Sequence, residues 1–185
     1  GVEGLLRFRH GERGILEPDS FIKTAELGGR IAKLTDFVLD QATQWCAVWQ
    51  AAGWPLTVAV NLSKAGLGDL TLPDRAAALC EQHGLATGQL VFELTESSLA
   101  TVATALLEVT TRLRLKGFQL SLDDFGTGYA SLEELRSLPF NELKLDKQFV
   151  QAAGHDPRSR AILENACRLA TELKMSTVAE GVETR

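Results

Sequence analysis

Short apolar stretches alternate along the chain with longer stretches whose apolar residues recur every three or four positions. The short stretches are rich in Val, Leu and Phe, as buried strands are, and the longer ones have the spacing of helices. Between residues 34 and 50, for example, Leu34, Phe37, Val38, Ala42 and Trp45 recur at helical spacing. The pattern predicts strands over residues 2–6, 56–60, 90–94, 118–122, 142–145 and 177–179, and helices over 34–50, 73–82, 101–116, 131–137 and 158–173.

Turn and capping residues separate these segments. Gly53 and Pro55 follow the first long helix, Pro73 suits the first turn of the next, and Gly117 is a natural C-terminal cap. Strands that are separated by helices are repeated βα units, and such units form parallel sheets. We therefore predict an α/β fold, organised as one domain over residues 1–185.

The composition is that of a globular protein, with 45% hydrophobic and 23% charged residues and no apolar run of membrane-spanning length. No signal peptide is recognisable at the N-terminus. The three cysteines and three histidines are scattered, which argues against a zinc site and suits a reducing cytoplasm. A net charge of -5 argues against binding of a DNA or RNA polymer, and we expect no membrane contact by this segment.

Polar residues gather where the predicted strands end. Asn61 follows one strand, Glu93 closes the next, and Asp123 and Asp124 follow a third. The same pattern includes Glu3, Glu96, Lys144, Asp146, Glu180 and Glu183. In a βα barrel the carboxyl ends of the strands converge on one mouth, so these side chains are expected to meet there.

Several carboxylates in one cleft repel each other unless positive charge offsets them. Carboxylate and amide oxygens suit hard cations such as Mg²⁺ or Mn²⁺, and more carboxylates than one ion needs suggest two ions. Paired metals typically activate water against phosphoesters. Because adjacent residues of a strand point to opposite faces, Asp123 and Asp124 reach one metal only through a bend, which Gly126 and Gly128 can supply.

Each of these residues also has a simpler interpretation. A single acid at a strand end is more often a helix N-cap or a solvated turn residue. Arg7 can be part of an ordinary ion pair, and Lys144 can be a buried lysine paired with Asp146. The Gly-x-Gly at residues 126–128 is weak support for phosphate binding, and the tryptophans suit core or interface packing.

Six short motifs stand in order along the chain. They are Glu-Gly-Leu-Leu-Arg-Phe at residues 3–8, Ala-Val-Asn-Leu-Ser at 59–63, Phe-Glu-Leu-Thr-Glu-Ser at 92–97, Leu-Asp-Asp-Phe-Gly-Thr-Gly-Tyr-Ala-Ser at 122–131, Leu-Lys-Leu-Asp at 143–146 and Val-Ala-Glu-Gly-Val-Glu-Thr at 178–184. Together they resemble the motifs of the EAL domain family of cyclic di-GMP phosphodiesterases. The run at 122–131 is the most specific, and the motif at 3–8 is similar to the signature that names the family.

The resemblance implies a TIM-like (β/α) barrel, here incomplete because the family's first and last strands are absent, and two divalent cations, Mg²⁺ or Mn²⁺. The implied reaction is hydrolysis of cyclic di-GMP to linear pGpG by an activated water. The implied metal ligands are Glu3, Asn61, Glu93 and Asp123 for one ion, and Asp123, Asp124 and Glu180 for the other.

The resemblance also implies roles for residues around the metals. Lys144 would orient the attacking water, with Glu180 also in the catalytic set, and Glu96 would anchor the loop over residues 125–131. Glu183 would support the site near Glu180. Arg7, Leu5 and Asp146 would contact the substrate, Arg7 by gripping a phosphate.

Some features depart from the family pattern or leave alternatives open. Gly4 replaces the signature alanine and Ala130 a frequent serine.

We expect this partial domain to fold poorly alone and to belong to a longer protein. Its expected partners are cyclic di-GMP, an upstream GGDEF or sensory domain, and a second copy in a homodimer. A non-catalytic cyclic di-GMP receptor on the same fold is the main alternative, and a barrel enzyme for another phosphate ester a weaker one.

Overall fold

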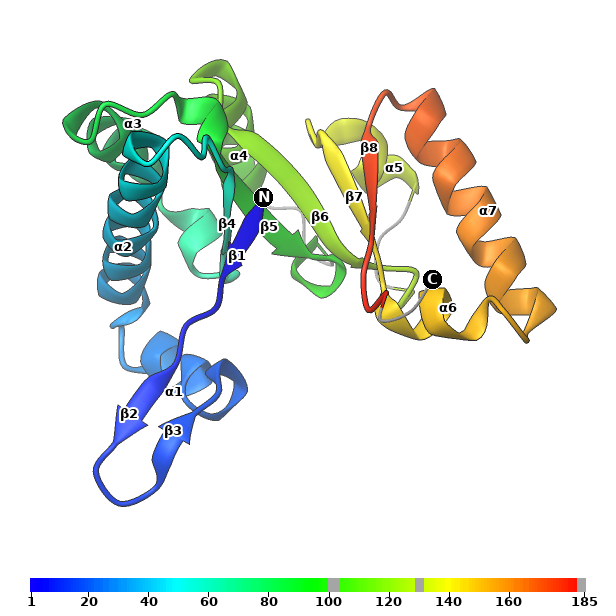
Figure 1. Cartoon of the computed structure of the whole chain (residues 1–185), viewed down its shortest axis with the longest axis horizontal. Coiled ribbons are helices and arrows are strands. Elements are labelled where there is room, and N and C mark those ends of the chain that lie inside the picture. Colours follow the sequence, from blue (N-terminus) through cyan, green and yellow to red (C-terminus); the bar gives the residue numbers. More distant parts are fainter. Residues whose placement is uncertain (100–103, 129–131, 183–185) are drawn as a thin grey trace.

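The computed structural model describes residues 1–99, 104–128 and 132–182, and its centre is a six-stranded parallel sheet (Figure 1). All five neighbouring pairs of strands run in parallel, in the order β1-β4-β5-β6-β7-β8. The strands are β1 (Val2–Gly4), β4 (Val58–Asn61), β5 (Leu90–Thr95), β6 (Gln119–Phe125), β7 (Glu142–Leu145) and β8 (Ser176–Ala179). The prediction of a parallel α/β sheet from the alternating pattern is thus confirmed.

The sheet curls into a half-barrel with helices along its outer side (Figure 1). The longer helices are α2 (Ile31–Ala51), α3 (Leu72–Gln82), α4 (Thr104–Leu115) and α7 (Pro157–Glu172), and α5 (Leu132–Ser137) is shorter. The TIM-like, incomplete barrel expected from the resemblance is therefore confirmed. Residues 101–103, which open one predicted helix, lie outside the described residues.

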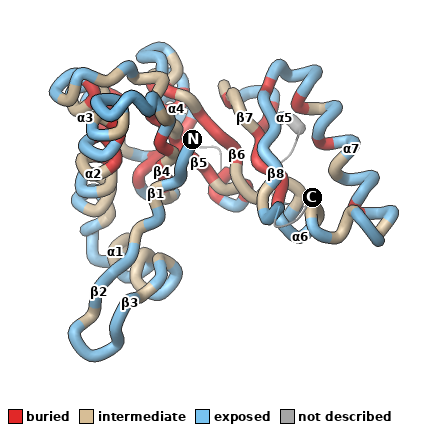
Figure 2. Tube along the Cα trace, viewed as in Figure 1, coloured by how far each residue is buried: buried red, intermediate tan, exposed pale blue. Residues whose placement is uncertain are grey.

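The apolar pattern explains the packing of the half-barrel. Buried positions run along the central strands and the inner faces of the helices (Figure 2). Phe92 on β5 and Phe118 before β6 are fully buried, and their rings meet edge to face with centroids 5.3 Å apart. Successive residues are buried along both β5 and β6, so side chains on both faces of these two strands are covered, and they form the centre of the packed sheet.

Several short elements were not predicted from the sequence. Residues that follow β1 form a hairpin of two three-residue strands, β2 (Phe8–His10) and β3 (Gly14–Leu16), which projects from the half-barrel and leads into α1 (Ile22–Leu27) (Figure 1). The short helix α6 (Lys147–Ala152) follows β7. The predicted strand over residues 2–6 was too long, because the chain leaves the sheet after Gly4.

The sheet has two open edges. Within the described residues β1 pairs only with β4, and β8 only with β7. Every residue of β8 is exposed. No helix in the described parts of the chain combines the length and the apolar character that crossing a bilayer requires.

Candidate active site

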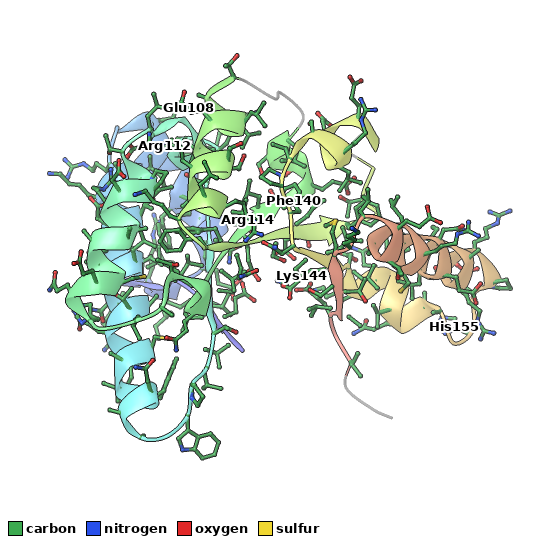
Figure 3. The ribbon with its side chains drawn as sticks, turned by 90° about the horizontal axis from the view of Figure 1, so that it is seen from above. Glu108, Arg112, Arg114, Phe140, Lys144 and His155 are labelled. Atoms are coloured by element: carbon green, nitrogen blue, oxygen red, sulfur yellow. The ribbon has the colours of Figure 1, made fainter. Side chains whose placement is uncertain are left out.

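Lys144 on β7 lies near the middle of the molecule (Figure 3). Its ammonium group is surrounded by carboxylates that lie on, or directly after, four other strands. Its Nζ is 2.8 Å from Glu180 Oε1, 3.0 Å from Glu93 Oε1 and 3.1 Å from Asp123 Oδ1. Glu3 Oε2 is 3.9 Å away. The strand ends therefore do converge on one point, as the pattern of polar residues predicts.

Hydrogen bonds and a second acidic group extend this centre. Asn61 at the end of β4 donates from Nδ2 to Glu3 Oε1 at 2.8 Å, which ties β1 to β4 across the site. Carboxylate oxygens of Asp123, Asp124 and Glu180 lie within 4.8 Å of one another. We call Glu3, Glu93, Asp123, Asp124 and Glu180 the acidic cluster.

The backbone bends at the paired aspartates. Asp124 has φ 57°, in the left-handed region, and the pairing of β6 with β7 shifts register between Leu122 and Phe125. Gly126 and Gly128 follow with φ 108° and 99°. This bend lets two adjacent carboxylates share one side of the site, and it confirms the sequence expectation, although the left-handed conformation begins at Asp124 itself.

Crowding and burial perturb the ionisation of the cluster. Burial raises the pKa of Glu93 to about 7, against the pull of Lys144, and Glu3 and Asp123 add to the rise. The pKa of Asp124 rises to about 6, first through burial and then through Asp123 and neighbouring carboxylates. Burial alone would lower the pKa of Lys144, but its hydrogen bond to Glu180 and the charges of Glu93 and Asp123 raise it.

One buried oxygen shows that the cluster is not satisfied by protein groups alone. Glu93 is 3% exposed, and within the described residues its Oε2 has no hydrogen-bond partner. A buried carboxylate oxygen without a partner is costly. A divalent cation would satisfy it, and the all-oxygen donor set of the acidic cluster with Asn61 fits Mg²⁺ or Mn²⁺.

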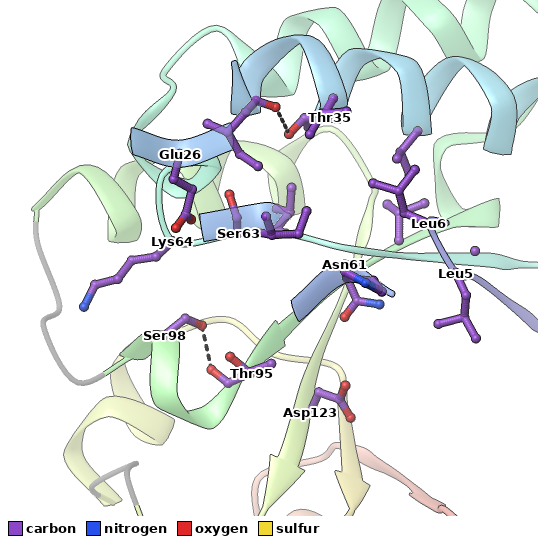
Figure 4. Close-up of a pocket in the computed structure, with 18 of the residues that line it drawn as sticks. Leu5, Leu6, Glu26, Thr35, Asn61, Ser63, Lys64, Thr95, Ser98 and Asp123 are labelled. Carbon is purple, nitrogen blue, oxygen red and sulfur yellow. Dashed lines mark hydrogen bonds between the residues drawn. The ribbon is translucent and has the colours of Figure 1, made fainter. Parts of the chain in front are cut away.

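A cavity of about 510 Å³ opens beside the acidic cluster. Asn61 and Asp123 line it from β4 and β6, with Leu5, Ser63 and Lys64 among the other residues around it (Figure 4). The polar groups of the strand ends therefore meet a space large enough for a ligand, bounded on the far side by apolar residues of α1 and α2.

Comparison with known proteins assigns the family. The sequence model of the EAL domain matches residues 1–185. The chain belongs to the EAL domain family. Two relatives from Pseudomonas aeruginosa illustrate the likeness: MucR, a bifunctional diguanylate cyclase/cyclic di-GMP phosphodiesterase, is 38% identical over 187 residues, and RocR, a cyclic di-GMP phosphodiesterase, is 35% identical over 184 residues.

Solved structures of EAL domains agree with the half-barrel. The structure described as PaMucR phosphodiesterase in complex with c-di-GMP has a TM-score of 0.88 and 37% identity, over 99% of this chain and 74% of that one. The FimX EAL domain from P. aeruginosa bound to c-di-GMP, at 22% identity and a TM-score of 0.87, shows the same fold. The matched region includes all of this chain but only 27% of the length of MucR and 47% of the length of RocR.

Glu96 holds the loop that follows the paired aspartates of this EAL domain. It is almost fully buried, and its Oε2 accepts hydrogen bonds from Gly126 N at 3.1 Å, Thr127 Oγ1 at 3.0 Å and Gly128 N at 3.2 Å. A carboxylate that accepts several such bonds fixes the loop relative to β5. Residues 129–131 of the loop lie outside the described residues.

The other residues expected in the site are placed less centrally. Arg7 donates to the carbonyl of its neighbour Leu6 and lies 3.9 Å from Glu17, and it lines a smaller cavity of about 260 Å³ next to the larger one. Leu5 lines both cavities. Asp146 does not pair with Lys144, but caps α6 by accepting from Gln148 N at 2.7 Å. Glu183 lies outside the described residues.

Sequence reasoning missed the contribution of α6. The helix packs Phe149 and Lys147 against the turns that follow Asp124 and Glu180. Asp146 was a usable signal, because an aspartate before a run of helix-forming residues is a common N-cap. The segment is only six residues long, so its periodicity is too short to read.

Proposed function

We propose that this EAL domain is the catalytic part of a divalent-metal-dependent phosphodiesterase that hydrolyses cyclic di-GMP to linear pGpG. The observation that carries the proposal is the convergence of carboxylates from separate strands on one buried point, with one carboxylate oxygen left unsatisfied. The names of MucR and RocR supply the substrate class.

Asp123 is the member of the acidic cluster that both proposed metal sites would share. Glu3, Asn61, Glu93 and Asp123 would hold one Mg²⁺ or Mn²⁺, and Asp123, Asp124 and Glu180 a second. When bound, the two ions would neutralise the cluster and lower the pKa of a bound water. The close approach of oxygens from Asp123, Asp124 and Glu180 supports the second group of ligands.

Lys144 would orient the attacking water. Its ammonium has three N–H donors and lies between Glu93 and Glu180. One N–H can therefore donate to a water while the others keep their ion pairs with the carboxylates. The water oxygen would form a new bond to phosphorus while one ester P–O bond breaks. The leaving sugar oxygen would take up the proton that the attacking water gives up, and the ring of the dinucleotide would open to pGpG.

The substrate would lie in the 510 Å³ cavity, with the scissile phosphate toward Asp123 and Asp124. Arg7 would grip a phosphate from the neighbouring cavity by turning away from Glu17, since their 3.9 Å pair is weak and exposed. Leu5 would pack against the ligand, and Glu96 would keep the loop after β6 closed over the site. Asp146 would affect substrate binding indirectly, by capping α6. Glu183 would support Glu180.

The setting of the reaction is part of the proposal. We propose a cytoplasmic site, because the described cysteines are free thiols. MucR combines a diguanylate cyclase with a phosphodiesterase in one chain, which supports an upstream GGDEF or sensory domain here. A homodimer is a further proposed partner arrangement.

Turnover tests the proposal against the receptor alternative. The natural-length protein, incubated with cyclic di-GMP and Mn²⁺, should yield pGpG, and EDTA should stop the reaction until Mn²⁺ is restored in excess. Asp123→Asn should remain folded and bind the ligand but form no pGpG. Ligand binding by the unmodified protein without any product would identify a receptor and overturn the assignment as an enzyme.

A further inference from the structure

Helix α6 contacts the two turns that follow Asp124 and Glu180, two members of the acidic cluster. Gly126, two residues after Asp124, lies so close to α6 that a Cβ added there would be 2.7 Å from Phe149 Cε2. Gly181 directly follows Glu180, and a Cβ there would be 2.7 Å from Lys147 Cβ. Both glycines have left-handed φ, 108° and 67°. Two turns from different strands therefore rest on one helix.

Further bonds fix the helix and its second contact. Gln151 Nε2 donates to the carbonyl oxygen of Gly181 at 3.3 Å. Asp146, at the end of the strand that carries Lys144, caps α6 by accepting from Gln148 N. The strand that presents Lys144 and the helix that touches both turns are thus joined without an intervening loop.

We infer that α6 is a shared platform that sets the separation between the paired aspartates and Glu180, with Phe149 and Gln151 as positioning residues. Oxygens of Asp123, Asp124 and Glu180 lie within 4.8 Å of one another. Lys144 offsets part of their mutual repulsion, and α6 supports the backbone turns after Asp124 and Glu180. Metal sites require such support, because ligands that are displaced by a fraction of an ångström bind poorly. The inference rests on the proposed function in taking these three residues as metal ligands.

Two glycines of the same loop provide a matched test. Gly126→Ala and Gly128→Ala each place a side chain at φ near 100°, so their backbone strain is similar. A Cβ at Gly126 meets Phe149, whereas one at Gly128 meets no atom of the described residues within 4 Å. In the natural-length protein, Mn²⁺ affinity measured from the EPR signal of free Mn²⁺ should fall by about tenfold more for Gly126→Ala than for Gly128→Ala.

Substitutions on the helix test the other side of the contact. Phe149→Ala should weaken Mn²⁺ binding by about tenfold and lower kcat with little change in KM, since it displaces ligands rather than the substrate cavity. Gln148→Ala, an exposed side chain on the same helix that is not among the nearest neighbours of either glycine, should leave Mn²⁺ affinity unchanged. Combining Gly126→Ala with Phe149→Ala should cost little more than either change alone, because both disturb one contact.

The outcomes separate this inference from the proposed function. Equal Mn²⁺ affinities for the two alanine variants in the loop, or a wild-type affinity in Phe149→Ala, would overturn the platform while leaving the enzyme assignment intact. If Phe149→Ala does not fold, Gln151→Met, which removes only an exposed hydrogen bond to the Gly181 turn, gives the same test. Failure of the unmodified protein to bind Mn²⁺ or form pGpG would instead remove the proposed function itself.

Discussion

At the residue scale, Asp124 combines an unusual backbone conformation with an unfavourable charge. Its φ of 57° is one that few side chains other than Asn and Asp adopt readily. Its carboxylate is partly buried among other carboxylates, which raises its pKa from 3.8 to about 6. The ionised form of Asp124 therefore destabilises the metal-free fold. A residue that serves ligand binding at the expense of stability is expected to have this effect.

Asp124→Asn should make the metal-free protein more stable at pH 7.5 but not at pH 4. Because the folded pKa is raised, the wild type loses the contribution of Asp124 to stability as pH rises from about 4 through about 6, and asparagine does not titrate. Thermal unfolding in EDTA at the two pH values measures the difference. A gain of equal size at both would show that charge at Asp124 is not the cause. Asp40→Asn on α2, away from the cluster, serves as the control.

Lys144 has the opposite effect on the metal-free fold, since it is the cation among the carboxylates. Lys144→Met should lower the free energy of unfolding by about 3 kcal/mol, as expected when one partner of a buried ionic network is removed. It should also lower kcat. Denaturant unfolding in EDTA checks the first effect, with Lys33→Met on the exposed face of α2 as control. An unchanged unfolding midpoint would mean that the ion pairs of Lys144 contribute no net stability.

At the scale of elements, the site depends on loops that are tied to neighbouring strands. Glu96, after β5, accepts three hydrogen bonds from the loop after β6, so the two elements move together. Gly126 and Gly128 in this loop have positive φ values, and glycine backbones are conformationally free, so the bonds to Glu96 restrict them. Glu96 thus links the order of the loop to the geometry of Asp123 and Asp124.

Glu96→Gln should loosen that loop without unfolding the protein. Glutamine keeps an acceptor of similar size but loses the charge that strengthens the bonds from Gly126 and Gly128. Amide exchange of the peptide that contains both glycines should become faster, and turnover should fall by about tenfold. Glu81→Gln on the exposed side of α3 should change neither. Unaltered exchange in Glu96→Gln would show that other contacts hold the loop.

The elements that could be predicted from the sequence are those with long or strongly apolar patterns. The strands β5 and β7 and the helix α3 begin and end within one residue of the predicted bounds. The hairpin β2–β3 and the helix α6 could not be found in this way, because three- and six-residue elements carry too little periodicity.

The convergence of Glu3, Glu93 and Asp123 could be predicted, since parallel topology alone brings strand ends together. The contacts of Phe149 could not, because they depend on how a turn folds back onto a helix.

At the scale of the whole molecule, the acidic cluster connects most of the sheet. Its members come from or directly follow β1, β5, β6 and β8, including both open edges of the half-barrel. Cation binding would therefore tie the first and last strands to the centre. The edges are otherwise held by one neighbour each within the described residues, so they are the parts whose stability the ions should affect most.

Mn²⁺ should raise the unfolding temperature of the natural-length protein in a concentration-dependent manner. A ligand present at 100 times its Kd and bound only by the folded state adds about 2.7 kcal/mol to stability. Asp123→Asn, which removes the ligand shared by both proposed ions, should lose most of this gain. A rise of the same size in the variant would place the stabilising ions elsewhere.

The most direct test of the account is the position of bound metal. Crystals of the natural-length protein grown with Mn²⁺ and cyclic di-GMP should show two anomalous scattering peaks on either side of Asp123, one also ligated by Glu3, Asn61 and Glu93 and the other by Asp124 and Glu180. Absence of peaks at the acidic cluster, or peaks at other carboxylates only, would contradict the claim that these strand ends form a metal-dependent active site.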